Sequence, residues 1–177
     1  MQRDLMSRFL LKRDGVFTDK TLHGPQFRIK DNDDEKDYSV EAVISSSRVD
    51  SDNDRILPRA LEDWVKNNAG EPILMFREHK REVLLGEWNE FELRDMEDYK
   101  GEVELVAKGV MYEEMSAVQD ARAAMKRKRL NATSVGMRIG DVRYGNGSFE
   151  IGIVDIKEAS LVVWGCLLYT SPSPRDS

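Results

Sequence analysis

Apolar and polar side chains alternate along several short stretches of this chain, a pattern typical of strands that bury one face. The alternation is clear in residues 38–46, where Val40, Ala42 and Ile44 fall on one side. A continuous apolar run, such as residues 71–76, is also typical of a short buried strand. Strands are predicted for seven stretches: 38–46, 71–76, 83–95, 101–112, 132–139, 149–156 and 158–164.

Two further stretches have the spacing and the end signals of helices. Residues 58–70 begin with Pro58 in the first turn and end at Asn-Ala-Gly, as helices commonly do. Residues 113–129 are rich in alanine, with acidic side chains first and basic side chains last, which suits the helix dipole. Helices are therefore predicted for both stretches.

The order of these elements predicts an α+β fold. The strands mostly follow one another, without the regular strand–helix alternation of a doubly wound sheet. Asn146 and Gly147, between two strand stretches, are a strong signal for a β-hairpin. We therefore expect a mostly antiparallel β-barrel, or a strongly curled sheet, of about seven strands with two or more outer helices.

Length and composition divide the chain into three parts. The 177 residues suffice for one domain with a real core. Residues 1–36 are polar and are predicted to be a mobile N-terminal arm, and residues 37–165 are the expected domain. Residues 166–177 depart abruptly from the strand pattern, and "CLLYTSPSPRD" matches one reading frame of a transposase adapter used in sequencing libraries. We expect this tail to be adapter-derived, the gene fragment to end near Gly165, and Cys166 to carry no disulfide or thiol chemistry.

The charge and hydropathy of the chain disfavour two classes of partner. A formal net charge of -6 argues against nucleic acid or an anionic membrane as the main partner. No apolar run approaches the roughly 20 residues that a membrane-spanning helix requires. The N-terminal residues also lack the continuous apolar region of a signal peptide. A cytoplasmic protein is therefore expected.

An acidic loop before the first helix raises the question of a calcium site. Asp50, Asp52 and Asp54 stand at alternate positions, as calcium ligands often do. An EF-hand requires glycine at the sixth loop position and a bidentate glutamate at the twelfth, where this chain has Arg55 and Leu61. A solvated turn that caps the helix explains these carboxylates better than a calcium site.

His79 and Ser134 are the residues that point to catalysis. His79 follows an apolar strand where the chain turns polar. An isolated histidine is more often a surface residue, but histidine's ordinary pKa near neutrality also suits a general base. With one histidine in the domain and no native cysteine, neither a zinc site nor another cofactor is expected. A serine hydroxyl needs a base within reach to act as a nucleophile, and His79 is the one credible base for Ser134.

A third group usually orients the histidine of such a pair. Glu158 is a carboxylate in strand-rich sequence near the end of the domain, with Asp155 and Asp141 as weaker candidates. Gly136 lacks a Cβ and would let a substrate backbone come close to Ser134. Because serine and glutamate are common residues, the pattern alone leaves this interpretation open beside a purely structural one.

Four stretches carry a further pattern. They are "VDSDNDRILPRAL", an acidic turn before a helix start; "FREHKREVLLGEW", a histidine segment; "LNATSVGMRIG", a serine strand; and "IKEASLVVWG", a strand near the domain end. In this order they resemble the phage prohead proteases of the HK97 type, the capsid-maturation serine proteases related to herpesvirus assemblins. The resemblance runs from about residue 38 to about residue 165.

The resemblance implies an assemblin-like barrel in which Ser134 is the nucleophile and His79 the general base. Glu158 lies in the late strand where assemblins carry a second histidine, and is the expected third member. The implied reaction is peptide cleavage by acyl transfer, with an oxyanion site whose donors the sequence leaves open.

The resemblance further implies a serine endopeptidase that processes the major capsid protein, its scaffolding segment and itself during prohead maturation. It would act in the host cytoplasm, inside the immature capsid, without a cofactor, and self-association is left open. Two alternatives are a non-catalytic capsid scaffold component with the same barrel and a small-molecule binding barrel with a deep apolar cavity. A structure separates them, because only the enzyme needs the His79 imidazole and the Ser134 hydroxyl within hydrogen-bond reach.

Overall fold

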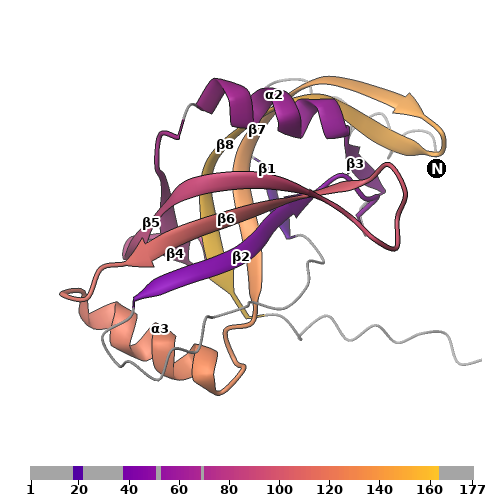
Figure 1. Cartoon of the computed structure of the whole chain (residues 1–177). Helices are drawn as coiled ribbons and strands as arrows, with labels where there is room; N and C mark the ends of the chain where they lie inside the picture. The colour runs from indigo at the N-terminus through magenta and orange to yellow at the C-terminus, as the bar shows by residue number, and fades with distance from the viewer. Residues whose placement is uncertain (1–17, 22–37, 51–52, 69, 164–177) are drawn as a thin grey trace, which may run out of the picture.

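The computed structural model describes residues 18–21, 38–50, 53–68 and 70–163 (Figure 1). The described strands are β1 (Thr18–Thr21), β2 (Ser39–Ser46), β3 (Asp54–Ile56), β4 (Ile73–Arg77), β5 (Lys80–Asp95), β6 (Val103–Met111), β7 (Ala132–Gly145) and β8 (Ser148–Val162). The described helices are α2 (Pro58–Asn68) and α3 (Ser116–Lys126). Seven of these strands, β2 to β8, lie in the domain that the sequence predicted.

All eight described strands belong to one curled sheet, in the order β1-β7-β8-β4-β5-β6-β2 with β3 beside β8. β3 and β4 both pair with β8 in parallel, whereas the other pairings are antiparallel. α2 connects β3 to β4 as a crossover, so that both strands run in the same direction, along β8.

The curl brings β2 and β7 together without closing a barrel. The Thr133 hydroxyl donates to the carbonyl oxygen of Val43 at 2.6 Å, but the described pairings contain no backbone ladder between these strands. The predicted α+β class, the curled sheet and the two helices are confirmed. The predicted mostly antiparallel barrel is wrong in two respects, because the sheet is mixed and forms an open half-barrel.

Each helix buries the apolar stripe that its sequence provides. α2 buries Ala60, Leu61 and Trp64, at a spacing that places them on one helical face. Trp64 meets Phe91 of β5 edge to face, with ring centroids 5.0 Å apart. In the view of Figure 1, α2 lies above the sheet and α3 below it. The two helices thus cover different ends of the half-barrel.

β7 and β8 form one long hairpin that carries much of the candidate chemistry. Its turn is the predicted Asn146-Gly147 pair, with φ angles of 50° and 81°. The two strands predicted at 149–156 and 158–164 are a single strand, β8. The buried Trp88 indole donates to the carbonyl oxygen of Ala159 at 2.9 Å. This bond ties β8 to the core next to Glu158.

Two strands lie where the sequence predicted none. β3 falls within the predicted acidic loop, and β1 falls within the predicted N-terminal arm. Both are short and pair with distant strands, so local alternation gave no sign of them. The rest of the arm and the predicted adapter-derived tail lie outside the described residues. Neither described helix has the length and apolar character needed to cross a membrane.

Candidate active site

His79 lies in the tight turn that joins β4 to β5. Arg77 and Lys80 pair across the turn, so Glu78 and His79 are its central residues. Their φ angles are 52° and 56°, and a type I′ hairpin turn requires positive φ at both central positions. Residues with a Cβ adopt positive φ uncommonly, so surrounding contacts must hold this turn in place.

The turn is held against the end of β8. The backbone N–H of Glu78 donates to the Leu161 carbonyl at 3.0 Å. The side-chain Oε1 of Glu78 accepts from the Val163 N–H at 2.6 Å. The backbone N–H of His79 donates to Ser160 Oγ at 3.2 Å. These bonds position the imidazole beside β8.

The β7–β8 hairpin presents two serines and a glutamate on one face. Ser134 is opposite Ser160 in the antiparallel register, and Gly136 is opposite Glu158. Opposed residues share a face of the sheet, as do residues two apart along a strand. The hydroxyl of Ser134 and the carboxylate of Glu158 therefore meet on the side where the His79 turn lies.

The three predicted site residues form one chain of hydrogen bonds. His79 Nε2 lies 2.7 Å from Ser134 Oγ, and Nδ1 lies 2.6 Å from Glu158 Oε1. A carboxylate oxygen only accepts, so Nδ1 carries the proton donated to Glu158 and the Nε2 lone pair faces the Ser134 hydroxyl. In this arrangement the imidazole can take the serine proton while the carboxylate holds the ring.

Ser160 is a further member that the sequence interpretation assigned no role. Its hydroxyl donates to Glu158 Oε2 at 2.7 Å and accepts from the His79 backbone N–H. One side chain thus fixes both the carboxylate and the backbone of the histidine. The sequence contained one sign of this role: a small hydroxyl residue stands two positions after Glu158, and therefore on the same face of the strand.

Gly136 has a different role from the one predicted. The sequence suggested that its missing Cβ makes room for a substrate backbone. A Cβ built at this position would lie 2.4 Å from Glu158 Oε1, so the space is filled by the carboxylate of the opposing strand. The glycine is needed because Glu158 folds across β7 to reach His79.

The three residues differ in their access to solvent. Ser134 is fully buried, whereas the side chains of His79 and Glu158 are 22% and 15% exposed to solvent. Partial exclusion of water strengthens hydrogen bonds within such a network. The exposed part of the imidazole marks the side on which solvent meets the site.

The weaker carboxylate candidates lie in other interactions. Asp155 pairs with Lys157 at 2.7 Å, and Asp141 pairs with Arg143 at 2.9 Å. In the acidic loop, Asp50 Oδ1 accepts from the Asp54 backbone N–H at 2.9 Å. Within the described part of the chain, no three His, Cys, Asp or Glu side chains are grouped closely enough to bind a metal ion.

A groove of about 620 Å³ lies between α2 and β8. Polar side chains such as Asp63, Asn67 and Lys157 contribute to its lining, and none of the three site residues does. It therefore differs from the deep apolar cavity that a small-molecule binding barrel would require.

Comparison with known proteins places this chain in a family. Residues 27–173 match the model of the caudovirus prohead serine proteases. The match covers most of the chain and includes all three residues of the hydrogen-bonded chain. The protein belongs to the caudovirus prohead serine protease family.

One curated protein and one solved structure are similar to this prohead protease family member. The prohead protease of Enterobacteria phage HK97 is 29% identical over 126 residues, which are 71% of this chain and 53% of that protein. The chain thus spans about half the length of this curated relative. The capsid assembly protease of bacteriophage T4 is 14% identical, with a TM-score of 0.56 over 85% of this chain and 97% of that chain. At this identity, the T4 structure shows a common fold.

Proposed function

We propose that this prohead protease family member is a serine endopeptidase that uses Ser134, His79 and Glu158. The observation that carries the proposal is the continuous hydrogen-bonded chain from Ser134 Oγ through the imidazole to Glu158, with separations of 2.7 and 2.6 Å. A purely structural role would not require the base, the hydroxyl and the carboxylate in this order. Family membership supports the same chemistry.

The proposed reaction has two halves. Ser134 Oγ attacks the carbonyl carbon of a peptide bond while His79 Nε2 takes the hydroxyl proton, which gives a tetrahedral intermediate. The imidazolium, stabilised by Glu158, returns the proton to the amine as the C–N bond breaks. Water then attacks the acyl-enzyme while His79 Nε2 takes its proton. The imidazolium returns this proton to Ser134 Oγ as the acyl C–O bond breaks, which releases the acid and the free serine.

The proposed substrates are the major capsid protein, its scaffolding segment and the protease itself. The T4 relative is described as a capsid assembly protease and the HK97 relative as a prohead protease, which supports processing inside an immature capsid in the host cell. The net charge of -6 suits encapsidation through protein contacts better than through nucleic acid.

The alternative is a capsid scaffold component that keeps this fold without hydrolysis. Incubating the chain with its phage's capsid protein, followed by mass analysis of the fragments, separates the two. The protease proposal predicts discrete capsid-protein fragments with the wild-type chain and none with a Ser134→Ala variant. Intact capsid protein with both chains, or equal fragmentation by both, contradicts it.

A further inference from the structure

The short strand β1 lies along the candidate active site. It pairs antiparallel with β7, with Thr21 opposite Ser134, Asp19 opposite Gly136 and Thr18 opposite Met137. Cα atoms opposed in an antiparallel pair are roughly 4.5 to 5.5 Å apart. A backbone segment of this chain therefore runs directly beside the serine that we propose as nucleophile.

The position of β1 is one that a peptide substrate could take. Extended peptides are commonly recognised by adding a strand to a sheet edge, where main-chain hydrogen bonds provide the affinity. The other edge of β7 is fully paired with β8 around Ser134. Among the described strands, the side that β1 occupies is thus the edge of β7 at which such a peptide could pair.

Burial of the nucleophile supports the same interpretation. Ser134 has no exposed surface, yet a reacting carbonyl carbon must come within about 3 to 3.5 Å of its Oγ. A substrate that arrives from outside can reach this atom only after part of the surrounding structure moves away. Two described segments are in direct register with Ser134, β8 on one side and β1 on the other. Of these two, β1 is the edge strand, and its described pairing to the sheet is through β7.

We propose that β1 occupies the binding position of the peptide substrate and must leave before another extended peptide can bind. This inference rests on the proposed protease function. The position of β1 also gives the direction of the bound peptide. The residues before the scissile bond run alongside β7 from Met137 towards Ser134, antiparallel to that strand. The ligand class is an extended polypeptide held mainly through its backbone, from this chain or from another protein.

The first test uses a pair of double variants in the full chain. Neighbouring residues of a strand point their N–H groups to opposite edges, so Asp19 or Lys20 must direct its N–H towards β7. Asp19→Pro with Lys20→Pro removes that donor and restricts the backbone. Asp19→Ala with Lys20→Ala makes the same side-chain truncation but keeps both N–H groups, and is the matched control.

The first measurement is the rate at which a fluorophosphonate probe labels Ser134, mapped by mass spectrometry. The proline variant should be labelled at least about tenfold faster than the wild-type chain, and the alanine variant within about twofold of it. Equal rates in the wild-type and proline variants would overturn the inference while leaving the protease function intact.

The second measurement separates the inference from the proposed function, because it needs no reactive serine. All chains carry Ser134→Ala, and a fluorescent synthetic peptide of residues 16–24 is titrated while its polarisation is measured. The peptide should bind the proline variant at least about tenfold more tightly than the chain with native β1. A peptide with proline at positions 19 and 20 should not bind.

Equal binding to both chains, or none to either, would overturn the inference. Tight binding to the proline variant together with an unreactive Ser134 would support the peptide site and contradict the protease function.

Discussion

Ser47 and Ser134 are buried serines that lie in networks with charged groups, and the comparison between them shows what makes one a candidate nucleophile. Ser47 and Ser134 are both fully buried. Ser47 Oγ donates to Glu102 Oε2 at 2.5 Å and accepts from the Val103 backbone N–H at 2.8 Å. Ser134 instead lies against an imidazole, 2.7 Å from His79 Nε2.

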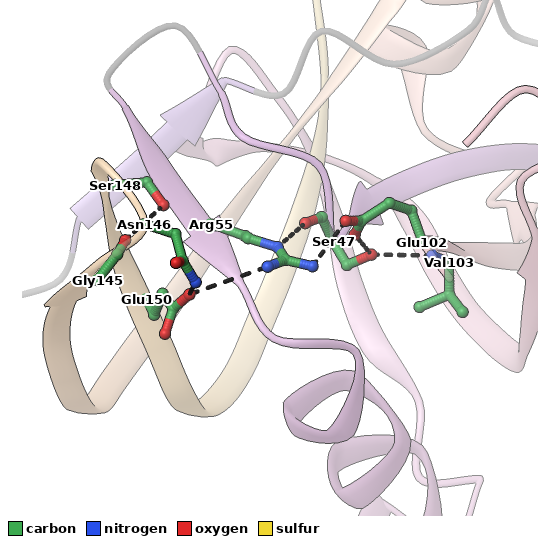
Figure 2. A network of polar contacts seen from close by, with 8 residues as sticks. All are labelled: Ser47, Arg55, Glu102, Val103, Gly145, Asn146, Ser148 and Glu150. Atoms are coloured by element: carbon green, nitrogen blue, oxygen red, sulfur yellow. Dashed lines mark hydrogen bonds and ion pairs between the residues drawn. The ribbon is translucent and has the colours of Figure 1, made fainter. Parts of the chain in front are cut away.

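The Ser47 network is built around ion pairs of one arginine (Figure 2). Arg55 lies between two carboxylates, with Nη2 at 2.6 Å from Glu102 Oε1 and Nη1 at 3.9 Å from Glu150 Oε1. Its Nε also donates to the Ser47 carbonyl at 3.3 Å, and Asn146 donates to Glu150 at 3.2 Å. The network ties the end of β2 to β3, to the start of β6 and to the β7–β8 hairpin.

The difference lies in which groups can exchange a proton. An arginine keeps its proton, and a carboxylate is a much weaker base than an imidazole. The Ser47 hydroxyl therefore has a hydrogen-bond acceptor but no effective base. Ser134 has a base that is itself oriented by a carboxylate. Similar burial and similar distances thus lead to a structural contact in one case and a candidate reaction centre in the other.

The largest predicted difference between the two serines is in activity. Ser134→Ala should lower kcat/KM for a capsid-derived peptide by at least about 10³-fold, because it removes the attacking oxygen. Ser47→Ala should keep kcat/KM within about threefold, once corrected for the folded fraction. Peptide hydrolysis and circular dichroism measure both properties. A comparable loss of activity in both variants would remove the distinction.

Glu158→Gln tests whether the carboxylate acts by orienting the histidine. The amide can donate as well as accept, so it no longer selects the tautomer with the Nε2 lone pair towards Ser134. We expect a loss of about 10²- to 10⁴-fold in kcat, smaller than that caused by His79→Ala. Equal losses in the two variants would indicate that Glu158 does more than orient the ring.

Gly136→Ala should damage the site from the opposite strand. The added Cβ would lie 2.4 Å from Glu158 Oε1 and displace the carboxylate from His79. We expect about a tenfold to 100-fold loss of kcat, which corresponds to roughly 1.4 to 2.7 kcal/mol. Gly140→Ala is the matched control on the same strand, because its Cβ would meet Ile153 at an ordinary 3.5 Å. A normal rate in the Gly136 variant would contradict this role for the glycine.

Arg55→Ala should affect stability and leave the chemistry unchanged. It removes the partner of two partly buried carboxylates and should lower the free energy of unfolding by about 1 to 3 kcal/mol. The activity per folded molecule should stay within about twofold. Urea denaturation and a parallel hydrolysis assay measure the two effects. A large loss of activity with normal stability would show that the Ser47 network communicates with the site.

The smallest predicted effect is at Ser160. Ser160→Ala loses the bond to Glu158 and the acceptor for the His79 N–H. It should reduce kcat about fivefold to tenfold, which corresponds to an increase of roughly 1 kcal/mol in the activation free energy. Ser45 is an equally buried serine whose Oγ makes no hydrogen bond with the described residues. Ser45→Ala should therefore leave kcat unchanged and stability equal or slightly higher. Equal activity in the two variants would mean that Ser160 has no positioning role.

Local sequence patterns predicted much of the fold, because they report what each segment buries. The alternation at Val40, Ala42 and Ile44 and the Asn146-Gly147 turn depend on near neighbours, and both appear in the structure. The parallel pairing of β3 with β8 and the open edge between β2 and β7 depend on distant segments. No local pattern contains that information.

The candidate site likewise has features that local sequence predicts and features that depend on distant contacts. His79 and Ser134 could be selected because a base is scarce in this chain and a serine with a glycine two residues later is unusual in a strand. Glu158 was separated from Asp155 and Asp141 only by its position in the late strand, and the register opposite Gly136 explains how it reaches His79. The positive φ angles of the turn and the role of Ser160 depend on contacts with β8, so the sequence alone did not indicate them.

Site-mapped labelling in a His79 variant tests the central claim most directly. The wild-type chain and the His79→Ala variant are incubated with a fluorophosphonate probe, and the modified residue is identified by peptide mass analysis. A single adduct on Ser134 is expected in the wild-type chain, formed at least about 100-fold more slowly in the variant, with Ser47 and Ser160 unmodified. An adduct on another serine, or equal labelling of Ser134 without the imidazole, would contradict it.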